Sequence, residues 1–321
     1  MNSYQMNSYQ IQKPFLKWVG GKTQIIDKIL SKFPNQINNY HEIFVGGGSV
    51  LLAILSLKKS NHITISNNIY AYDINKPLID LYKHIQKNKD TLFSYVTELI
   101  TEYDSIHGDV INRKPTTIEE AKTSKESYFY WLRQRYNTMD KTSVECAAIF
   151  MILNKTCFRG LYREGPNGFN VPYGHYKKTP TIITKKDLIY ISELIQPVQF
   201  IHSDFRDSLT NVMEGDFMYL DPPYAPENSK SFVGYVADGF DSNMHTDLFE
   251  MVKTLCPHVA KSNDKNNNLQ MQPHTTFVMS NAKVPFVLDH FENYVCDDIL
   301  VRRAINSKNP ESTAREVIIH N

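Results

Sequence analysis

The sequence has few cysteines, no long apolar run and almost no net charge. Its four cysteines, Cys146, Cys157, Cys256 and Cys296, show no CxxC or Cys/His spacing, which favours buried thiols in a reducing compartment over a zinc site. No apolar stretch is long enough to span a bilayer, and the repeated MNSYQ start has neither the charge nor the apolar core of a signal peptide. We therefore expect a cytoplasmic protein without a metal or a membrane anchor, with a viral or nuclear compartment left open.

The charge balance limits how the chain can bind a polyanion. Lys and Arg total 35 against 34 Asp and Glu, so any footprint for nucleic acid must be local. With 321 residues, 41% hydrophobic and 21% charged, the composition is typical of a soluble globular protein with one large or two modest domains.

The strongest functional signal is the stretch Asp221-Pro222-Pro223-Tyr224. The apolar run 217–220 before it predicts a buried strand, which the two prolines terminate. Ligands of open α/β sheets bind at the carboxyl ends of strands, so Asp221 and the Pro222 carbonyl supply two acceptors there, beside the Tyr224 ring. This set suits a flat ring that bears an amino group. A strand followed by a simple Pro-Pro turn is the purely structural alternative.

Two glycine-containing segments near the start of the chain predict contacts with a nucleotide. In the segment 13–22, Trp18 stands between two lysines, and two glycines come just before Lys22 and a helical pattern. The segment 40–52 predicts a strand, a turn at Gly46, Gly47 and Gly48, and an apolar helix, which is the opening of a nucleotide-binding βα unit. The spacing matches neither the dinucleotide GxGxxG motif nor the Walker motif.

Two further predicted strands end in acids. The strand 69–75 contains Asp73 near its end, which is the position of an acid that holds a ribose diol, although a cap for the following helix is the alternative role. The strand 198–205 ends in Asp204 and Phe205, which suit the amino group and the face of an adenine.

Residues 76 to about 150 predict mostly helices, and the composition then changes. Between 154 and 180, basic and aromatic residues alternate, and the sequence 165–168, Gly-Pro-Asn-Gly, predicts the turn of a β-hairpin. A basic, aromatic hairpin can enter a DNA groove, pair guanidinium groups with guanine edges and wedge a ring into the base stack. A solvated hairpin whose aromatic rings pack inward is the alternative. The basic and aromatic residues are Lys155, Arg159, Arg163, Lys177, Lys178, Phe158, Tyr162, Phe169, Tyr173 and Tyr176.

The C-terminal part of the chain predicts more of the same sheet. The segment 277–281 is apolar and predicts a core strand. The segment 299–319 predicts a terminal hairpin, and its Arg302, Arg303 and Arg315 are candidates for contacts with phosphates.

Taken together, these motifs resemble the Dam-like (class alpha) DNA adenine-N6 methyltransferases. The matching pieces occur in the family's order, at residues 15–22, 44–50, 71–75, 160–163, 168–174, 203–206 and 221–226. The resemblance implies an α/β fold with a seven-stranded, Rossmann-like methyltransferase sheet. It also implies a catalytic domain formed by residues 11–75 and 184–321, and a mostly helical DNA target-recognition domain, residues 76–183, that carries the hairpin.

The resemblance also implies roles for individual residues. Those that would hold S-adenosylmethionine are Trp18, Lys22, Gly46, Gly48, Asp73, Asp204, Phe205 and Asp221. Those that would hold the target adenine are Asp221, Pro222, Pro223 and Tyr224. The residues at DNA-reading positions are Lys17, Arg159, Leu161, Arg163 and Pro172, with Phe158 at the wedge position. Lys17, Leu161, Arg163 and Pro172 match family positions that read a GATC site, so GATC is the first expectation. The family commonly has asparagine where this chain has Arg159, and this difference leaves CATG or another site with an AT step open.

The implied reaction is the direct transfer of a methyl group to an adenine that has been flipped out of double-stranded DNA, without a metal. The expected partner is duplex DNA, with a monomer or weak dimer as the active form and a separately acting cognate restriction endonuclease left open. Two other classes remain. A methyltransferase acting on RNA or on a protein glutamine would not need the basic hairpin, and a catalytically silent DNA-binding module would not need the filled cofactor positions.

Overall fold

The computed structural model describes residues 10–176, 178–226, 239–257, 274–302 and 313–321, and the structural statements below concern these residues. Lys177 and Arg303, which were named above as basic candidates, lie outside this part of the chain.

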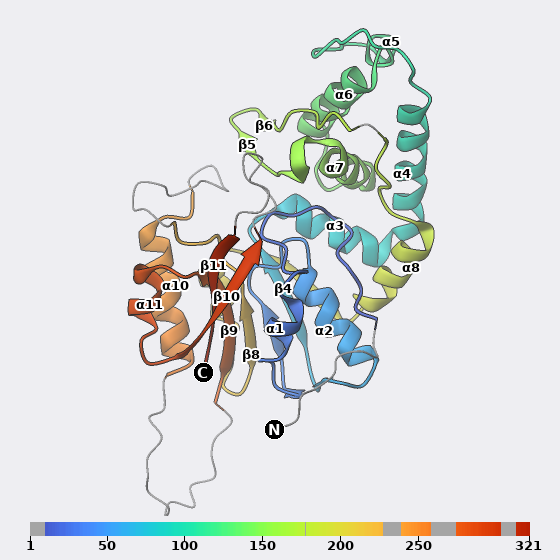
Figure 1. The fold of residues 1–321 in the computed structure, drawn as a ribbon. Coiled ribbons are helices and arrows are strands. Elements are labelled where there is room, and N and C mark those ends of the chain that lie inside the picture. Colours follow the sequence, from blue (N-terminus) through green and yellow to red (C-terminus); the bar gives the residue numbers. More distant parts are fainter. Residues whose placement is uncertain (1–9, 177, 227–238, 258–273, 303–312) are drawn as a thin grey trace, which may run out of the picture.

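A mixed seven-stranded sheet forms the centre of the fold (Figure 1), in the spatial order β10-β11-β9-β8-β2-β4-β7. The five strands from β9 to β7 are parallel, and β11 is antiparallel to both β9 and β10. The predicted core strand and terminal hairpin at the C-terminal end are therefore confirmed. The strands are β2 (Tyr40–Glu42), β4 (Ile69–Asp73), β7 (Val198–His202), β8 (Phe217–Leu220), β9 (Thr276–Ala282), β10 (Val295–Arg302) and β11 (Thr313–His320), and the short strands β1 (Gln36–Ile37) and β3 (Thr64–Ile65) pair with each other.

Helices cover both faces of this sheet, because successive side chains of a strand point to opposite faces. In β8, Phe217 and Tyr219 belong to one hydrophobic core, and Met218 and Leu220 belong to the other. The first core includes α1 (Ile26–Leu30), α2 (Ser49–Lys59), α3 (Lys76–Lys87) and α8 (Lys185–Leu194). The second includes α9 (Phe205–Leu209), α10 (Ser242–Leu255) and α11 (Pro285–His290). Figure 1 shows α10 and α11 on the opposite side of the sheet from α1 and α2.

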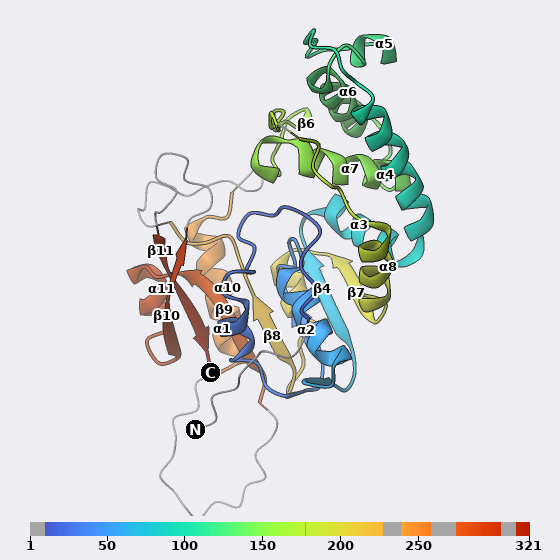
Figure 2. The same ribbon diagram turned by 45° about the vertical axis from the view of Figure 1, so that its right-hand side comes forward.

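A helical lobe, residues 89–173, lies beyond the carboxyl ends of the parallel strands (Figures 1 and 2). It contains α4 (Lys89–Asp104), α5 (Ile118–Ala121), α6 (Lys125–Thr138), α7 (Val144–Thr156) and the antiparallel pair β5 (Glu164–Gly165) and β6 (Gly168–Phe169). The predominance of helix after residue 76 is confirmed. Helix α7 is buried at every position from 146 to 154, which explains the uninterrupted apolar sequence that precedes Asn154.

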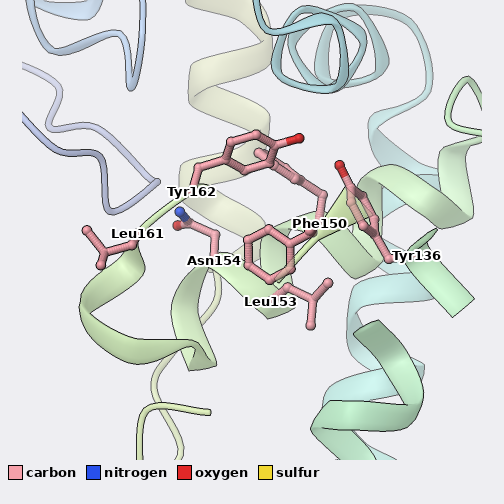
Figure 3. A pocket seen from close by; sticks show the side chains of 7 residues that line it. Tyr136, Phe150, Leu153, Asn154, Leu161 and Tyr162 are labelled. Atoms are coloured by element: carbon pink, nitrogen blue, oxygen red, sulfur yellow. The ribbon is translucent and has the colours of Figure 1, made fainter. Parts of the chain in front are cut away.

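Most of the aromatic residues around the hairpin pack inward. Phe169 and Tyr173 are buried, and the half-buried Tyr162 ring lies 5.6 Å from the Phe150 ring and 5.9 Å from the Trp18 ring. Figure 3 shows Tyr162 and Phe150 facing Tyr136 in this aromatic cluster. The exception is Phe158, which is 44% exposed. Inward packing therefore accounts for most of the aromatic pattern, but not for Phe158.

Candidate functional site

Four neighbouring parallel strands bring the predicted site residues to one edge of the sheet. Asp221 follows β8, the glycine turn follows β2, Asp73 ends β4, and Asp204 follows β7. The order β8-β2-β4-β7 places the glycine turn between Asp221 and Asp73. Adjacent strands lie about 4.8 Å apart, so two strand spacings separate the ends of β8 and β4 by roughly 10 Å. An elongated ligand can span that distance along the edge.

Two aromatic side chains pack directly on the glycine turn. A Cβ atom at Gly46 would lie 2.9 Å from Cδ1 of Trp18, and one at Gly48 would lie 2.6 Å from the Tyr82 hydroxyl oxygen. Both glycines also have positive φ, 48° and 71°. The Tyr82 hydroxyl donates to the Gly46 carbonyl at 3.0 Å. Glycine is thus required here by the protein's own packing, a reason that the sequence motif did not indicate.

Asp73 is held by backbone amides at the tip of β4. Its two oxygens accept from the amides of Gly46 and Asn75, each at 2.9 Å. The cap of α3 is Asn75, whose side chain accepts from Leu78, so the alternative role of Asp73 as the helix cap is wrong. Burial raises the pKa of Asp73, although these amide contacts oppose the shift. Each carboxylate oxygen keeps a lone pair with which it can accept a ligand hydroxyl.

Asp204 and Phe205 lie at the predicted edge of the sheet, but both already contact neighbouring residues of the protein. Asp204 caps α9 by accepting from the Arg206 amide at 2.9 Å. The Phe205 ring is only 3% exposed, because Phe44 and Phe240 lie 6.0 Å and 5.5 Å from it. In this conformation, therefore, aromatic side chains of the protein cover the ring expected to face an adenine.

Lys22 forms an ion pair with Asp221, the acid of the Asp-Pro-Pro-Tyr stretch. Its Nζ lies 2.7 Å from Oδ2 of Asp221, and it also lies 4.8 Å from the centre of the Tyr224 ring. Lys22 is 4% exposed and Asp221 is 19% exposed, so little water screens the pair. Burial raises the pKa of Asp221 to about 6, against the lowering effect of Lys22. The structure thus places Lys22 on the acid, where the resemblance implied contact with the cofactor.

Residues 223–225, which follow Asp221 and Pro222, form hydrogen bonds with three separate elements. We call residues 221–225 the acid-proline turn. Its braces come from α10, β11 and β9, so the turn is fixed to the scaffold on several sides. They are His245 Nε2, 2.9 Å from the Pro223 carbonyl; Glu316, which accepts from the Tyr224 hydroxyl at 2.9 Å; and Asn281, whose Oδ1 accepts from the Ala225 amide at 3.1 Å.

Two acceptors of this turn have no donor within the described part of the chain. One is Oδ1 of Asp221, which is buried and unpaired, and the other is the Pro222 carbonyl. The side-chain amide nitrogen of Asn281 is also buried without a partner among these residues. A buried polar atom that lacks a partner costs about 1–3 kcal/mol, so such atoms are natural contacts for a ligand.

A second buried acid lies beside Asp221 at the end of β2. Glu42 is buried and accepts from the Tyr40 hydroxyl at 2.7 Å. Burial raises the pKa of Glu42 to about 8, and the charge of Asp221 adds to the shift. At neutral pH, Glu42 is therefore mostly protonated, whereas Asp221, with its lower pKa, is mostly ionised.

A cavity of about 800 Å³ is lined by Lys22 and Glu316, which contact Asp221 and Tyr224 of the acid-proline turn. The segment 14–25 forms much of its wall, and the wall also includes Gly47, Arg159 and Glu316. Its volume lies in the range of about 300–1,000 Å³ that is typical of ligand sites. No cluster of three metal-ligating side chains occurs among the described residues.

Lys17, the first predicted DNA-reading residue, is bound to the end of α7. Asn154 accepts from the Lys17 amide at 2.9 Å and donates to its carbonyl at 2.7 Å. The Lys17 Nζ donates to the Lys155 carbonyl at 3.3 Å and to the Tyr176 hydroxyl at 3.0 Å. These contacts join the N-terminal segment of the chain to the helical lobe.

The other predicted DNA-reading residues surround the turn that follows α7. Phe158, which is exposed, donates its amide to the Pro172 carbonyl at 2.8 Å. Arg159 has a φ of 58°, lines the cavity, and places its guanidinium 5.0 Å from the Phe158 ring. Leu161 is half-buried, and Arg163 is exposed on the hairpin. The structure therefore gathers these residues at one end of the lobe, next to Lys17.

The chain matches the family model of D12 class N6 adenine-specific DNA methyltransferases over residues 18–285. It belongs to this family. It is 32% identical over 306 residues to the type II methyltransferase M.MjaIII of Methanocaldococcus jannaschii, covering 92% of this chain and 93% of that protein. The DNA adenine methylase of Haemophilus influenzae is 28% identical over 308 residues, covering 94% and 91%. That of Escherichia coli K12 is 26% identical over 297 residues, covering 92% and 90%.

The predicted resemblance to Dam-like enzymes is thus confirmed, and the chain is an adenine-specific DNA methyltransferase of the D12 class. Within the described ranges, no helix is both long and apolar enough to cross a membrane.

Sequence analysis missed several residues that shape the site of this D12 methyltransferase. Asn281 ends a predicted core strand, so a polar residue at a strand tip was a visible signal. His245, Asn154 and Glu316 gave no such signal, because each lies within a helix or strand and meets its partner only in the folded chain.

Proposed function

We propose that this chain transfers the methyl group of S-adenosylmethionine to N6 of an adenine flipped out of duplex DNA. The observation that supports it most is that two acceptors of the acid-proline turn, Asp221 Oδ1 and the Pro222 carbonyl, have no donor among the described residues. An adenine amino group carries two hydrogens, and each acceptor accepts a hydrogen bond from one of them. The nitrogen lone pair is then directed away from both acceptors, toward the methyl donor.

The residues around this edge fit the methyl donor, which supplies an electrophilic carbon on a sulfonium. Asp73 keeps lone pairs for ribose hydroxyls, and the glycine turn beside it lets a ligand approach the backbone. Trp18 packs on that turn and lines the adjoining cavity. We assign cofactor contacts to Trp18, Gly46, Gly48, Asp73, Asp204, Phe205 and Asp221, and we also assign Lys22 to the support of Asp221.

Charge explains why an acid is needed beside the amine. When the N6–carbon bond forms, the carbon–sulfur bond of the sulfonium breaks, which leaves a neutral thioether and places the positive charge on N6. The Asp221 carboxylate stabilises that charge as it develops, and it is the adjacent acceptor for the proton that N6 then loses. Lys22 fixes the other carboxylate oxygen and favours the ionised form despite burial. Tyr224 supplies a ring that can stack on the flipped base.

We propose that residues 76–183 recognise the DNA, and that residues 11–75 and 184–321 carry out the reaction. Support comes from the exposed ring of Phe158, which is available to enter the base stack, and from Arg159 on the cavity wall beside Lys17. Leu161, Arg163 and Pro172 lie around the same turn and are assigned to reading the bases. GATC is the first choice of site, with CATG or another site containing an AT step as the alternative. Digestion of methylated plasmid with nucleases that are blocked at one site or the other decides between them.

Asp221→Ala tests the central assignment. We expect the variant to lose transfer of tritiated methyl groups to DNA while still binding S-adenosylmethionine in part, because most of the assigned cofactor contacts remain. The matched control is Asp289→Ala, which removes an exposed acid on α11 and should behave as wild type. Retained DNA methylation in Asp221→Ala refutes the assignment.

The same assay separates the other classes. Wild-type protein is incubated with labelled cofactor and with DNA, RNA or protein. Label on DNA alone supports the proposal, whereas label on RNA or protein would show that the substrate is RNA or protein instead. Binding of DNA without any transfer would identify a silent binding module. A cognate restriction endonuclease that acts separately is a further proposal, since a type II methyltransferase is among the relatives.

A further inference from the structure

The Tyr224 hydroxyl joins the acid-proline turn to the C-terminal hairpin. It donates to Oε2 of Glu316 at 2.9 Å, across 92 positions of sequence. Glu316 lies in β11, where it is paired with Ala282 of β9 on one side and with Ile299 of β10 on the other. A carboxylate on the middle one of three hydrogen-bonded strands is anchored to a rigid part of the scaffold.

This hydrogen bond restricts the Tyr224 ring, which otherwise rotates about its two side-chain torsions. The bond holds the tip of the ring, and Lys22 Nζ lies 4.8 Å from the ring centre. Stacking on a base requires the ring to lie parallel to the base at close distance, so the orientation of this ring matters. Glu316 also lines the cavity of about 800 Å³, as Lys22 does.

The negative charge of Glu316, like its hydrogen bond to Tyr224, should favour methyl transfer. Lys22 is paired with Asp221, and the charge of Glu316 contributes to the raised pKa of Asp221. A second negative charge near Asp221 favours a transition state in which N6 becomes cationic.

We propose that Glu316 is a positioning residue for methyl transfer: it holds the Tyr224 ring against the flipped adenine and adds negative charge to the reaction site. This role rests on the proposed function and extends it to the C-terminal hairpin.

Steady-state kinetics of Glu316 variants test the role. Glu316→Ala should lower kcat about tenfold, as expected for loss of a hydrogen bond to a charged group, with KM for DNA and for S-adenosylmethionine nearly unchanged. Glu316→Gln keeps an acceptor of the same length but not the charge, so it should recover part of this loss. In a Tyr224→Phe background, which lacks the hydroxyl, the effect of Glu316→Ala should shrink to about twofold. The matched control is Glu292→Gln, at an exposed glutamate outside the site.

A fluorescent base reports the position of the ring. A duplex with 2-aminopurine in place of the target adenine becomes brighter when that base leaves the stack and dimmer when a tyrosine stacks on it. We expect the Glu316→Ala complex to be brighter than the wild-type complex and the Glu316→Gln complex to resemble wild type. If Glu316→Ala does not fold, Glu316→Asp, whose carboxylate is one methylene shorter, replaces it and should show the same changes.

The outcomes are distinct. Wild-type kcat and wild-type emission in Glu316→Ala, with an active wild-type enzyme, overturn the role of Glu316 and leave the proposed function intact. Equal effects of Glu316→Ala with and without the Tyr224 hydroxyl overturn it as well. A wild-type protein that methylates no DNA refutes the proposed function, and the positioning role with it.

Discussion

Replacing Lys22 by methionine removes the charge that faces Asp221 while keeping a side chain of similar length. Lys22 Nζ lies 2.7 Å from Oδ2 of Asp221, and both residues are largely shielded from water. With an effective dielectric of about 20 and charges about 4 Å apart, the lost interaction is about 4 kcal/mol. Because one pKa unit corresponds to 1.36 kcal/mol, this loss raises the pKa of Asp221 by about 3 units.

The sign of the effect on activity follows from the form of Asp221 that acts. The ionised carboxylate accepts the amino hydrogens, so activity should fall as the pH drops through the pKa of the acid. In the wild type this fall should occur near pH 6, the raised pKa of Asp221. In Lys22→Met it should move to about pH 9, so that roughly 1% of the enzyme is active at pH 7. Activity should then recover as the pH rises.

The assay is the pH dependence of kcat/KM for transfer of labelled methyl groups to a duplex that contains the methylated site, from about pH 5.5 to about pH 9.5. Lys28→Met, which removes an exposed lysine of α1, is the matched control and should keep the wild-type profile. A loss of activity in Lys22→Met that is the same at every pH would refute the electrostatic argument, as would an acid limb that stays near pH 6.

Three other substitutions test the scaffold of the site. Gly48→Ala places a Cβ atom 2.6 Å from the Tyr82 hydroxyl at a positive φ, so we expect a loss of about 1–3 kcal/mol in the free energy of unfolding, measured with urea; wild-type stability would contradict the packing argument. Asn154→Ala removes two hydrogen bonds to the Lys17 backbone and should cost about 2 kcal/mol in the same measurement, with faster proteolysis of the N-terminal segment, whereas unchanged proteolysis would show that this link is not needed. Burial lowers the pKa of His41, so near pH 6 the unfolded chain binds more protons than the folded protein does. The free energy of unfolding should therefore fall as the pH drops below about 6.5. His41→Gln should show a weaker fall, and an identical slope would exclude His41 as the cause.

Much of the fold could be predicted from the residues along each segment. The apolar run that stops at Asp221 is β8, and the uninterrupted apolar stretch before Asn154 is the buried helix α7. Such elements depend on backbone preferences and on the periodicity of neighbouring side chains, which are local properties. The same reasoning placed Asp73 and Asp204 at strand ends, and the strand order then brought them to one edge.

Side-chain partners could not be predicted in this way. Lys22 was expected at the cofactor and pairs with Asp221, and Phe205 was expected to face a base and is covered by Phe240. Glu316 carried no recognisable motif at all. A motif specifies which groups are present, but the tertiary packing of distant segments decides which of them touch.

The amino-acid sequence was therefore sufficient for the family, the class of chemistry and the ends of the strands, because these depend on short stretches whose residues are close in the chain. Only the folded chain settled which charges oppose one another at the acid-proline turn, which of its acceptors lack a donor among the described residues and which side chains hold it in place. The physical reason is that burial, pKa and hydrogen bonding are set by neighbours in space, and those neighbours come from β9, β11, α10 and the N-terminal segment.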